Sequence, residues 1–415
     1  MMNPVLSEKM KSSPRKGRKP FGLSSNVFFL GIVSFLTDVS SEMIFTILPL
    51  FLLNVLLVGT PVIGLIEGIA ESTATLLKIL SGWLSDRLGK RKVLAALGYG
   101  ISTLAKPFLY LASSWSLVLG VRFADRIGKG IRTSPRDALV ADSTSPQEMG
   151  KSFGFHRALD TLGAVVGLGA AAGIVFFLQK GGLELTRSTY QMLVLVGIVP
   201  AVIAVAIILF FVHDPRHKAS GDASVTLTSD STPKRKFGKR FKIFLAIMII
   251  FTLGNSSDAF LVLRAQDLGL SVFHILLVFV FFNLVYALIS LPAGMLSDKL
   301  GRRKVIILGW AIYALSYLGF ALASESWHIW LVFGLYGAYY GATEGVTRAF
   351  VADMVGAESR GTAYGFFHTA VGITALPASV LAGWLWHWID PAAPFFLGSA
   401  MAGIAAVSLI TLVRE

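Results

Sequence analysis

About twelve stretches of roughly 20 mostly apolar residues, separated by short polar breaks, occupy most of this 415-residue chain. A helix of that length crosses a bilayer core about 30 Å thick, and in lipid only helices and closed barrels satisfy their backbone groups. The apolar runs are continuous rather than alternating, which favours helices. The sequence therefore predicts an all-α membrane protein. We expect transmembrane helices at residues 26–56, 61–83, 93–112, 116–141, 151–178, 190–212, 241–263, 272–296, 304–323, 328–354, 362–385 and 393–413.

The formal charge of +13 is concentrated in segments that twelve crossings place on one side of the membrane. These basic segments lie within residues 9–19, 87–92, 216–240 and 299–304. Cytoplasmic loops carry an excess of lysine and arginine, so we expect both termini in the cytoplasm and the chain in the inner (cytoplasmic) membrane. The charge thus reflects topology, and we expect no nucleic-acid partner. Without cysteine there is no disulfide and no thiolate metal site.

An internal duplication relates the two halves of the chain at a spacing of about 212 residues. The segment GWLSDRLGKRK at 82–92 recurs as GMLSDKLGRRK at 294–304. Three further matches support the repeat: Val140-Ala-Asp142 with Val351-Ala-Asp353, Gly150-x-x-Phe-Gly-Phe155 with Gly361-x-x-Tyr-Gly-Phe366, and Ser40-Ser-Glu42 with Ser256-Ser-Asp258. Two six-helix units that both begin in the cytoplasm must be related by an axis along the membrane normal.

The repeated loop resembles the signature loop between helices two and three of the major facilitator superfamily, and the resemblance covers about residues 23–413. It implies the major facilitator fold, with twelve transmembrane helices in two pseudo-symmetric six-helix bundles. We expect a basic tail at 1–22, an N-terminal bundle at 23–213, a linker at 214–240 and a C-terminal bundle at 241–415. A gating role is predicted for Asp86, Arg87, Asp298 and Arg302 of the repeated loops. The same role is predicted for Arg132 and Arg136, which lie on the fourth predicted helix near Asp86.

Acidic residues inside the predicted spans are costly in lipid and must face the protein interior. Asp38 and Glu42 are four residues apart and share a helix face, as do Glu67 and Glu71. Burial disfavours an ionised carboxylate and a neighbouring arginine favours it, so a movement that changes either environment can load and release a proton. The candidates for proton coupling are Asp38, Glu42, Glu71 and Asp160. A role in neutralising cations on the fourth helix is the alternative.

The fourth predicted helix carries a basic stripe along one face, formed by Arg122, Arg126, Lys129, Arg132 and Arg136. The stripe either faces acids on other helices or lines a cavity for an anionic solute. The first three residues lie at the depth where solutes bind in such folds. The candidates for solute binding are Arg122, Arg126, Lys129, Asn255, Asp258, Asn283, Tyr286, Tyr336, Tyr340 and Glu344. Glu344 is also spaced for an ion pair with Arg348 on its own helix.

Glycines spaced along the fifth predicted helix, Gly163 and Gly167 among them, predict close packing against a neighbouring helix. The series is similar to the glycine-rich motif of drug and proton antiporters, with Leu168 in place of the expected proline, and it favours export by antiport.

These features predict a secondary active transporter that moves a small organic solute, amphiphilic or anionic, by alternating access with proton coupling and in the direction of efflux. An organic-anion or phosphate-ester exchanger or symporter, or a non-transporting receptor on the same fold, are the alternatives. No motif for a nucleotide, a metal or a catalytic nucleophile is found, so we expect no enzyme activity, no cofactor and no metal. The expected partners are the solute, protons and membrane lipid, with the chain acting as a monomer.

Overall fold

In the computed structural model the described residues are 23–144, 149–179, 182–214, 237–355 and 360–413, and within these ranges every regular element is helical. The first half contains α1 (Ser25–Phe45), α2 (Leu48–Leu50), η3 (Phe51–Val55), α3 (Thr60–Leu88), α4 (Arg91–Ala105), η4 (Lys106–Leu109), α5 (Trp115–Asp142), α6 (Met149–Gln179) and α7 (Arg187–Phe211). The second contains α8 (Lys239–Gly254), α9 (Ala259–Asp267), α10 (Val272–Leu300), α11 (Arg302–Leu322), α12 (Ser326–Asp353), α13 (Arg360–Trp388) and α14 (Ala393–Leu412). The predicted all-α fold is confirmed, and the helix order is consistent with twelve crossings.

Local sequence explains where several helices begin and end. The side-chain oxygens of Ser24, Ser114 and Ser271 accept hydrogen bonds from backbone N–H groups in the first turns of α1, α5 and α10. At the other end, Gly89 stops α3 in a left-handed conformation with φ of 63°, and Gly301 follows α10 with φ of 91°. These are the glycines of the repeated loop, so the duplication preserves a backbone geometry that glycine adopts readily.

Three of the predicted helices are interrupted. The first stops at Phe45, and after a short break it continues as α2 and the π-helical turn η3. The seventh breaks between Gly254 and Ala259, where Asn-Ser-Ser-Asp replaces apolar residues that favour a helix. The third ends in a 3₁₀ turn at Pro107, which has no N–H to extend an α-helix. The first helix of each half is thus discontinuous.

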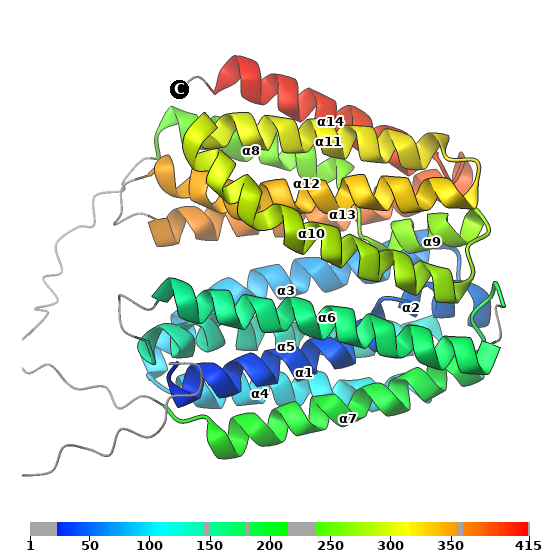
Figure 1. The fold of residues 1–415 in the computed structure, drawn as a ribbon, viewed down its shortest axis with the longest axis horizontal. Coiled ribbons are helices and arrows are strands. Elements are labelled where there is room, and N and C mark those ends of the chain that lie inside the picture. Colours follow the sequence, from blue (N-terminus) through cyan, green and yellow to red (C-terminus); the bar gives the residue numbers. More distant parts are fainter. Residues whose placement is uncertain (1–22, 145–148, 180–181, 215–236, 356–359, 414–415) are drawn as a thin grey trace, which may run out of the picture.

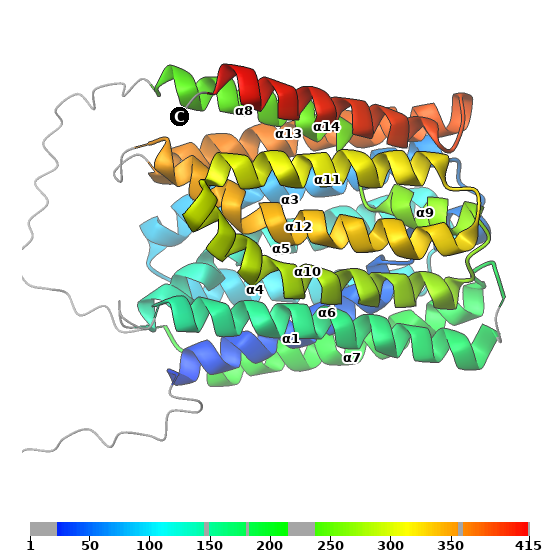
Figure 2. The same ribbon diagram turned by 45° about the horizontal axis from the view of Figure 1, so that its top comes forward.

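The helices gather into two bundles that lie side by side, one from each half (Figure 1; Figure 2). Within the first, α1 packs on α6 and α7, and α5 packs on α3 and α4. Within the second, α12 packs on α10 and α11, and α14 packs on α8 and α11. The most extensive packing between the bundles is that of α3 with α13 and of α6 with α10, and α9 makes smaller contacts with α2 and α3. The predicted tail at 1–22 and residues 215–236 of the predicted linker lie outside the described residues.

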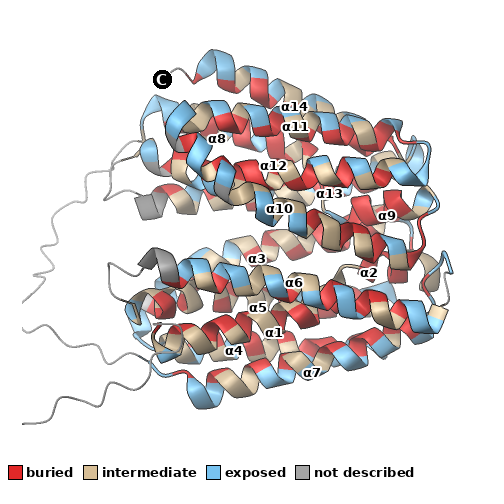
Figure 3. Ribbon diagram, in the orientation of Figure 1, coloured by how far each residue is buried: buried red, intermediate tan, exposed pale blue. Residues whose placement is uncertain are grey.

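The outer surface of the bundles carries large apolar side chains, among them Val199 and Phe210 on α7, Leu315 on α11 and Val407 on α14. Exposed residues follow the outward faces of the helices (Figure 3). Eight helical segments in the described part of the chain are long and apolar enough to cross a membrane. The helices α3, α4, α5 and α12 fall outside this group, and α3, α5 and α12 each carry several charged residues. An apolar exterior around charged inner helices is the arrangement expected of a protein in lipid.

The close packing predicted for the fifth helix, which is α6, is confirmed at two of its glycines. A Cβ atom added to Gly163 would lie 2.5 Å from the carbonyl oxygen of Phe35, and one added to Gly167 would lie 2.6 Å from that of Val39. The absence of a side chain at both positions therefore lets α6 approach the backbone of α1 closely.

The two ends of the bundles carry different loops. The repeated loops at 87–92 and 299–304 lie at one end, which we call the basic end. The loop between η3 and α3 and the loop between α11 and α12 lie at the other, which we call the far end.

Candidate functional site

A central cavity of about 420 Å³ lies between the two halves. Its walls come from α1, α2, α3 and α5 of the first half. The second half contributes α8, α9, α10, α12, α13 and the α8–α9 break. The cavity meets both interruptions of the first helices, because Thr46 at the end of α1 and residues 255–258 line it. Its charged and amide side chains are Glu42, Glu67, Glu71, Arg122, Arg126, Asn255 and Asp258.

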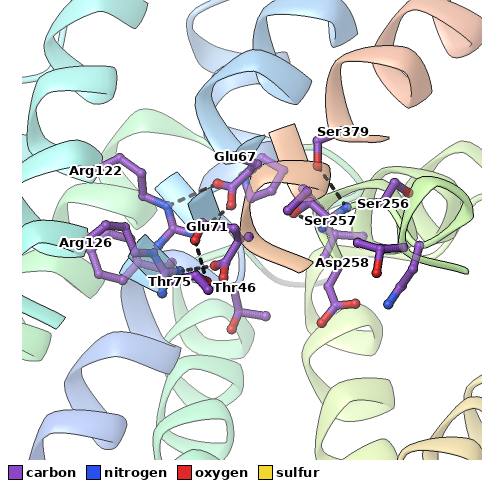
Figure 4. Close-up of a pocket in the computed structure, with 18 of the residues that line it drawn as sticks. Thr46, Glu67, Glu71, Thr75, Arg122, Arg126, Ser256, Ser257, Asp258 and Ser379 are labelled. Carbon is purple, nitrogen blue, oxygen red and sulfur yellow. Dashed lines mark hydrogen bonds and ion pairs between the residues drawn. The ribbon is translucent and has the colours of Figure 1, made fainter. Parts of the chain in front are cut away.

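Both arginines of this cavity form ion pairs with glutamates of α3 (Figure 4). Arg122 binds Glu67 through two hydrogen bonds, from Nε at 3.2 Å and from Nη2 at 2.7 Å, and the two side chains are 5% and 4% exposed. Arg126 Nη2 lies 3.1 Å from Glu71 Oε1. A two-bond pair between guanidinium and carboxylate is geometrically specific and strong. The charges of Arg122 and Arg126 in the predicted basic stripe are therefore neutralised by glutamates of the second predicted helix, α3.

Two other carboxylates of the cavity are held only by neutral hydroxyl groups. Thr46 Oγ1 donates to Glu42 Oε2 at 2.6 Å, and Tyr336 Oη donates to Asp258 Oδ1 at 2.7 Å. No ion pair joins either carboxylate to lysine or arginine in the described part of the chain. Glu42 and Asp258 thus face the cavity from opposite halves, each without a cationic partner.

A second cavity, of about 510 Å³, lies toward the basic end between α5 and α6 of one half and α10 and α12 of the other. Across it, Arg157 Nη2 donates to Tyr286 Oη at 2.8 Å and to Glu344 Oε2 at 3.2 Å. Tyr286 in turn donates to Glu344 at 2.5 Å. We call Arg157, Tyr286 and Glu344 the cross-half latch, because in the described part of the chain their ion pair is the one that joins the two halves.

Polar side chains at intervals of four residues along α1 connect the surroundings of the two cavities. Ser34 Oγ is hydrogen bonded to His156 Nε2 at 3.0 Å and accepts from Arg136 Nη1 at 3.1 Å, and both partners line the second cavity. Glu42 lines the central cavity, and Asp38 lies between these two levels with Asp160, Lys129 and Arg132 among its charged neighbours. One face of α1 therefore carries a line of groups that can bind protons or form hydrogen bonds.

The candidate coupling and solute residues divide between the two cavities. Glu42, Glu71, Arg122, Arg126, Asn255, Asp258 and Tyr340 line the central cavity, and Asp160, Tyr286 and Glu344 line the second. Four candidates line neither, and one of them is Asp38, which lies between the two levels. Lys129 has Arg126 and Glu71 among its charged neighbours, Asn283 donates to Phe279 O on its own helix, and Tyr336 is buried behind Asp258. The predicted pair of Glu344 and Arg348 forms at 2.8 Å.

The candidate gating residues that are described contact groups of their own half. Arg302 pairs with Asp353 at 3.0 Å, which reproduces in the second half the pair of Arg91 with Asp142 in the first. Arg132 donates to Ser102 and lies over the ring of Tyr99, Arg136 pairs with Asp137, and Arg87 lies over Trp83. The side chains of Asp86 and Asp298 lie outside the described residues. Their gating role stays a prediction.

Two functional candidates were missing from the predicted site, Glu67 and Arg157. Glu67 shares a helix face with Glu71, so the spacing already indicated that both could meet the basic stripe. Arg157 belongs to a polar cluster near the start of α6, where it also approaches Asp160. Its partners in the second half lie 129 and 187 residues away in the sequence, and no local pattern identifies them.

An apolar outer surface, two bundles and a charged cavity between them define a multi-pass integral membrane protein built to bind a small solute. A sequence model of the Major Facilitator Superfamily matches residues 30–263 and 243–415, and the chain belongs to this family of transporters. It is 36% identical over 416 residues to an uncharacterized MFS-type transporter of Methanocaldococcus jannaschii, covering 99% of this chain and 100% of the relative.

Two further matches are more distant. A class G tetracycline resistance protein of Vibrio anguillarum is 25% identical over 338 residues, which covers 74% of this chain and 79% of that protein. The crystal structure of a POT family transporter in complex with 5-aminolevulinic acid superimposes with a TM-score of 0.77 at 13% identity, covering 96% of this chain and 97% of that one. The structural match supports the fold.

Proposed function

We propose that this chain is a proton-coupled secondary active transporter that exports a small organic solute by alternating access. The observation that carries the proposal is the central cavity, which meets the interrupted first helix of both halves and holds carboxylates and ion pairs away from lipid. Discontinuous helices at the interface of two repeats are where transporters of this architecture bind their solutes. The tetracycline resistance relative supports export.

Contacts between the halves support alternating access. Toward the far end, Thr60 Oγ1 donates to Gly383 O at 3.1 Å and Gln266 Nε2 donates to Leu183 O at 2.9 Å. Toward the basic end the halves meet at the cross-half latch. Each contact joins polar groups that water can satisfy after separation, so rocking one half against the other breaks no extended apolar core at these points.

Proton coupling is proposed through Asp38, Glu42, Glu71 and Asp160. Asp38 has both carboxylates and cations around it, so rearrangement of its neighbours changes the relative stability of its ionised form. A proton gradient and membrane potential supply energy without a nucleotide-binding domain, at about 2.3 kcal/mol per charge per 100 mV. We place the chain in the inner membrane as a monomer in contact with lipid, with both termini and the basic end on the cytoplasmic side.

The test uses proteoliposomes loaded with a pH-sensitive dye and exposed to a panel of small organic solutes that includes tetracycline. We expect at least one solute to move protons through the parent protein, and Asp38→Asn to abolish this response. Glu184→Gln is the matched control, because Glu184 is exposed and lines neither cavity. Solute accumulation that does not depend on the imposed pH gradient would contradict proton coupling.

Anion exchange and a receptor function are less well supported. Exchange of organic anions or phosphate esters requires free cationic groups, whereas Arg122 and Arg126 are engaged by Glu67 and Glu71. A receptor function would use the basic tail or the linker to bind a partner, and residues 1–22 and 215–236 of these segments lie outside the described part of the chain. Counterflow of carboxylates at fixed pH would favour exchange over proton coupling.

A further inference from the structure

Building on the proposed function, we infer that the transported solute is an organic cation, and that Glu42 and Asp258 are its charge partners in the central cavity. This assignment differs from the amphiphilic or anionic solute expected from the basic stripe of the fourth predicted helix. It follows from how the charges of the cavity are paired.

The charges that line the cavity do not balance. Four carboxylates, Glu42, Glu67, Glu71 and Asp258, face two guanidinium groups. The pairs of Arg122 with Glu67 and of Arg126 with Glu71 use both cations. Glu42 and Asp258 remain, each bonded to one hydroxyl group. A cationic partner stabilises an ionised carboxylate at membrane depth, and the cavity leaves room for a solute to supply it.

Arg122 and the Nε atom of Arg126 are poorly placed to receive an anion. Arg122 Nη1 and Arg126 Nε have no hydrogen-bond partner among the described residues, but each of these atoms exposes less than 1 Å² of surface. A solute in the cavity therefore does not contact them. To bind the remaining nitrogens of Arg122, an anion would have to displace Glu67, whose side chain is 4% exposed, and leave that carboxylate buried without a partner.

The two unpaired carboxylates occupy equivalent places in the duplication. Ser40-Ser-Glu42 corresponds to Ser256-Ser-Asp258, and each acid lies where the first helix of its half is interrupted. Glu42 belongs to the last turn of α1, where the carboxyl end of the helix adds partial negative charge to that of the acid. Asp258 lies in the break between α8 and α9, directly before the first residue of α9. Both halves thus present a negative site to the same cavity.

Aromatic rings complete the site for an organic cation. Phe279 and Tyr340 line the cavity from the second half, the half that also contributes Asp258. The face of an aromatic ring attracts ammonium and quaternary ammonium groups. The cavity volume of about 420 Å³ is within the usual range for small-molecule sites, about 300 to 1,000 Å³. The ligand class is therefore an amine or quaternary ammonium compound of small-molecule size.

The test measures thermal stabilisation of the full chain in detergent by probes that differ in charge. Choline, its neutral carbon analogue 3,3-dimethylbutan-1-ol and the anion 3,3-dimethylbutanoate have similar shapes, and tetraphenylphosphonium serves as a larger cation. We expect saturable stabilisation by at least one of the two cations and by neither of the other probes. Glu42→Gln and Asp258→Asn should each weaken the apparent affinity for the cation at least tenfold, whereas Glu184→Gln should leave it unchanged. Unfolding temperatures without probe establish that the variants are folded.

Several results would overturn the assignment. These are stabilisation by the anion, no stabilisation by either cation, or cation binding that both cavity variants retain. If the variants bind cations normally but lose proton-driven transport, the acids serve proton coupling alone, and the proposed function stands without this inference. If cations bind through the two acids but no solute moves protons in proteoliposomes, the proposed function fails while the cation site stands.

Discussion

Substituting Arg157 by glutamine should shift the protein toward conformations in which the halves separate at the basic end. The change removes the hydrogen bonds from Arg157 to Tyr286 and Glu344. It leaves the contacts of Glu344 with Tyr286 and Arg348 inside the second half. Because Arg157 is 54% exposed and Glu344 28% exposed, solvent screens the ion pair. We assign about 1 kcal/mol to the pair and up to about 0.4 kcal/mol more to the tyrosine bond after this screening. The ratio of separated to closed conformations should therefore rise about five- to tenfold.

The chain suits a distance measurement, because it contains no cysteine that would compete for labels. Spin labels on cysteines at Leu97 in α4 and Leu308 in α11 would report the separation of the halves by double electron-electron resonance. Both residues are 52% exposed, and each is the seventh residue of a helix that begins at the basic end. We expect Arg157→Gln to increase the population at long distances.

Arg348→Gln provides the matched control, since Arg348 bonds Glu344 from the same helix and does not bridge the halves. An unchanged distance distribution in Arg157→Gln, or an equal shift in Arg348→Gln, would refute the role given to the latch. Arg157→Lys should retain part of the ion pair but lose the forked geometry, and it should therefore lie between the parent and Arg157→Gln.

Other predictions concern folding and closure. Arg122→Gln leaves Glu67 buried without its partner and should lower the free energy of unfolding by about 3 to 5 kcal/mol, measured by reversible unfolding. The double change Arg122→Met and Glu67→Leu should recover most of this loss. Equal stability of the single and double variants would contradict the prediction. Gly372→Leu should slow transport and lower the free energy of unfolding by about 1 to 3 kcal/mol, because a Cβ at this position would lie 2.7 Å from Thr75 of α3. Gly403→Leu should behave like the parent protein, because a Cβ at Gly403 would meet open space. Arg302→Gln should cost under about 1 kcal/mol in the same unfolding assay, because Asp353 is 52% exposed, and a larger loss would indicate a further role.

The main lines of the fold could be predicted because they depend on local patterns. Apolar length gives the helices, and the duplicated loop gives two equivalent halves. The spacing of Gly163 and Gly167 also indicated the close contact of α6 with a neighbour. The break at residues 255–258 was not predicted, since the flanking residues continue an apolar run and only four polar residues mark the interruption.

The candidate site was predicted less completely, because its chemistry depends on which helices are neighbours. A stripe of arginines on one helix indicates an anion site when it is considered alone, but the structure places Glu67 and Glu71 against Arg122 and Arg126. The repeat contained the information that Glu42 and Asp258 are equivalent. That neither has a cationic partner follows only from the three-dimensional pairing of the other charges.

The duplication also explains why a single substitution should loosen the latch. With the offset of 211 residues that relates Asp142 to Asp353, the counterpart of Arg157 is His368 and that of Glu344 is Thr133. Thr133 carries no charge, and its hydroxyl donates to Lys129 O on its own helix. The ion pairs of Arg91 with Asp142 and of Arg302 with Asp353 occur in both halves, so losing one leaves an equivalent pair in the other. The described residues provide no such equivalent for Arg157 and Glu344, and the energy of this contact therefore acts directly on the equilibrium between separated and closed halves.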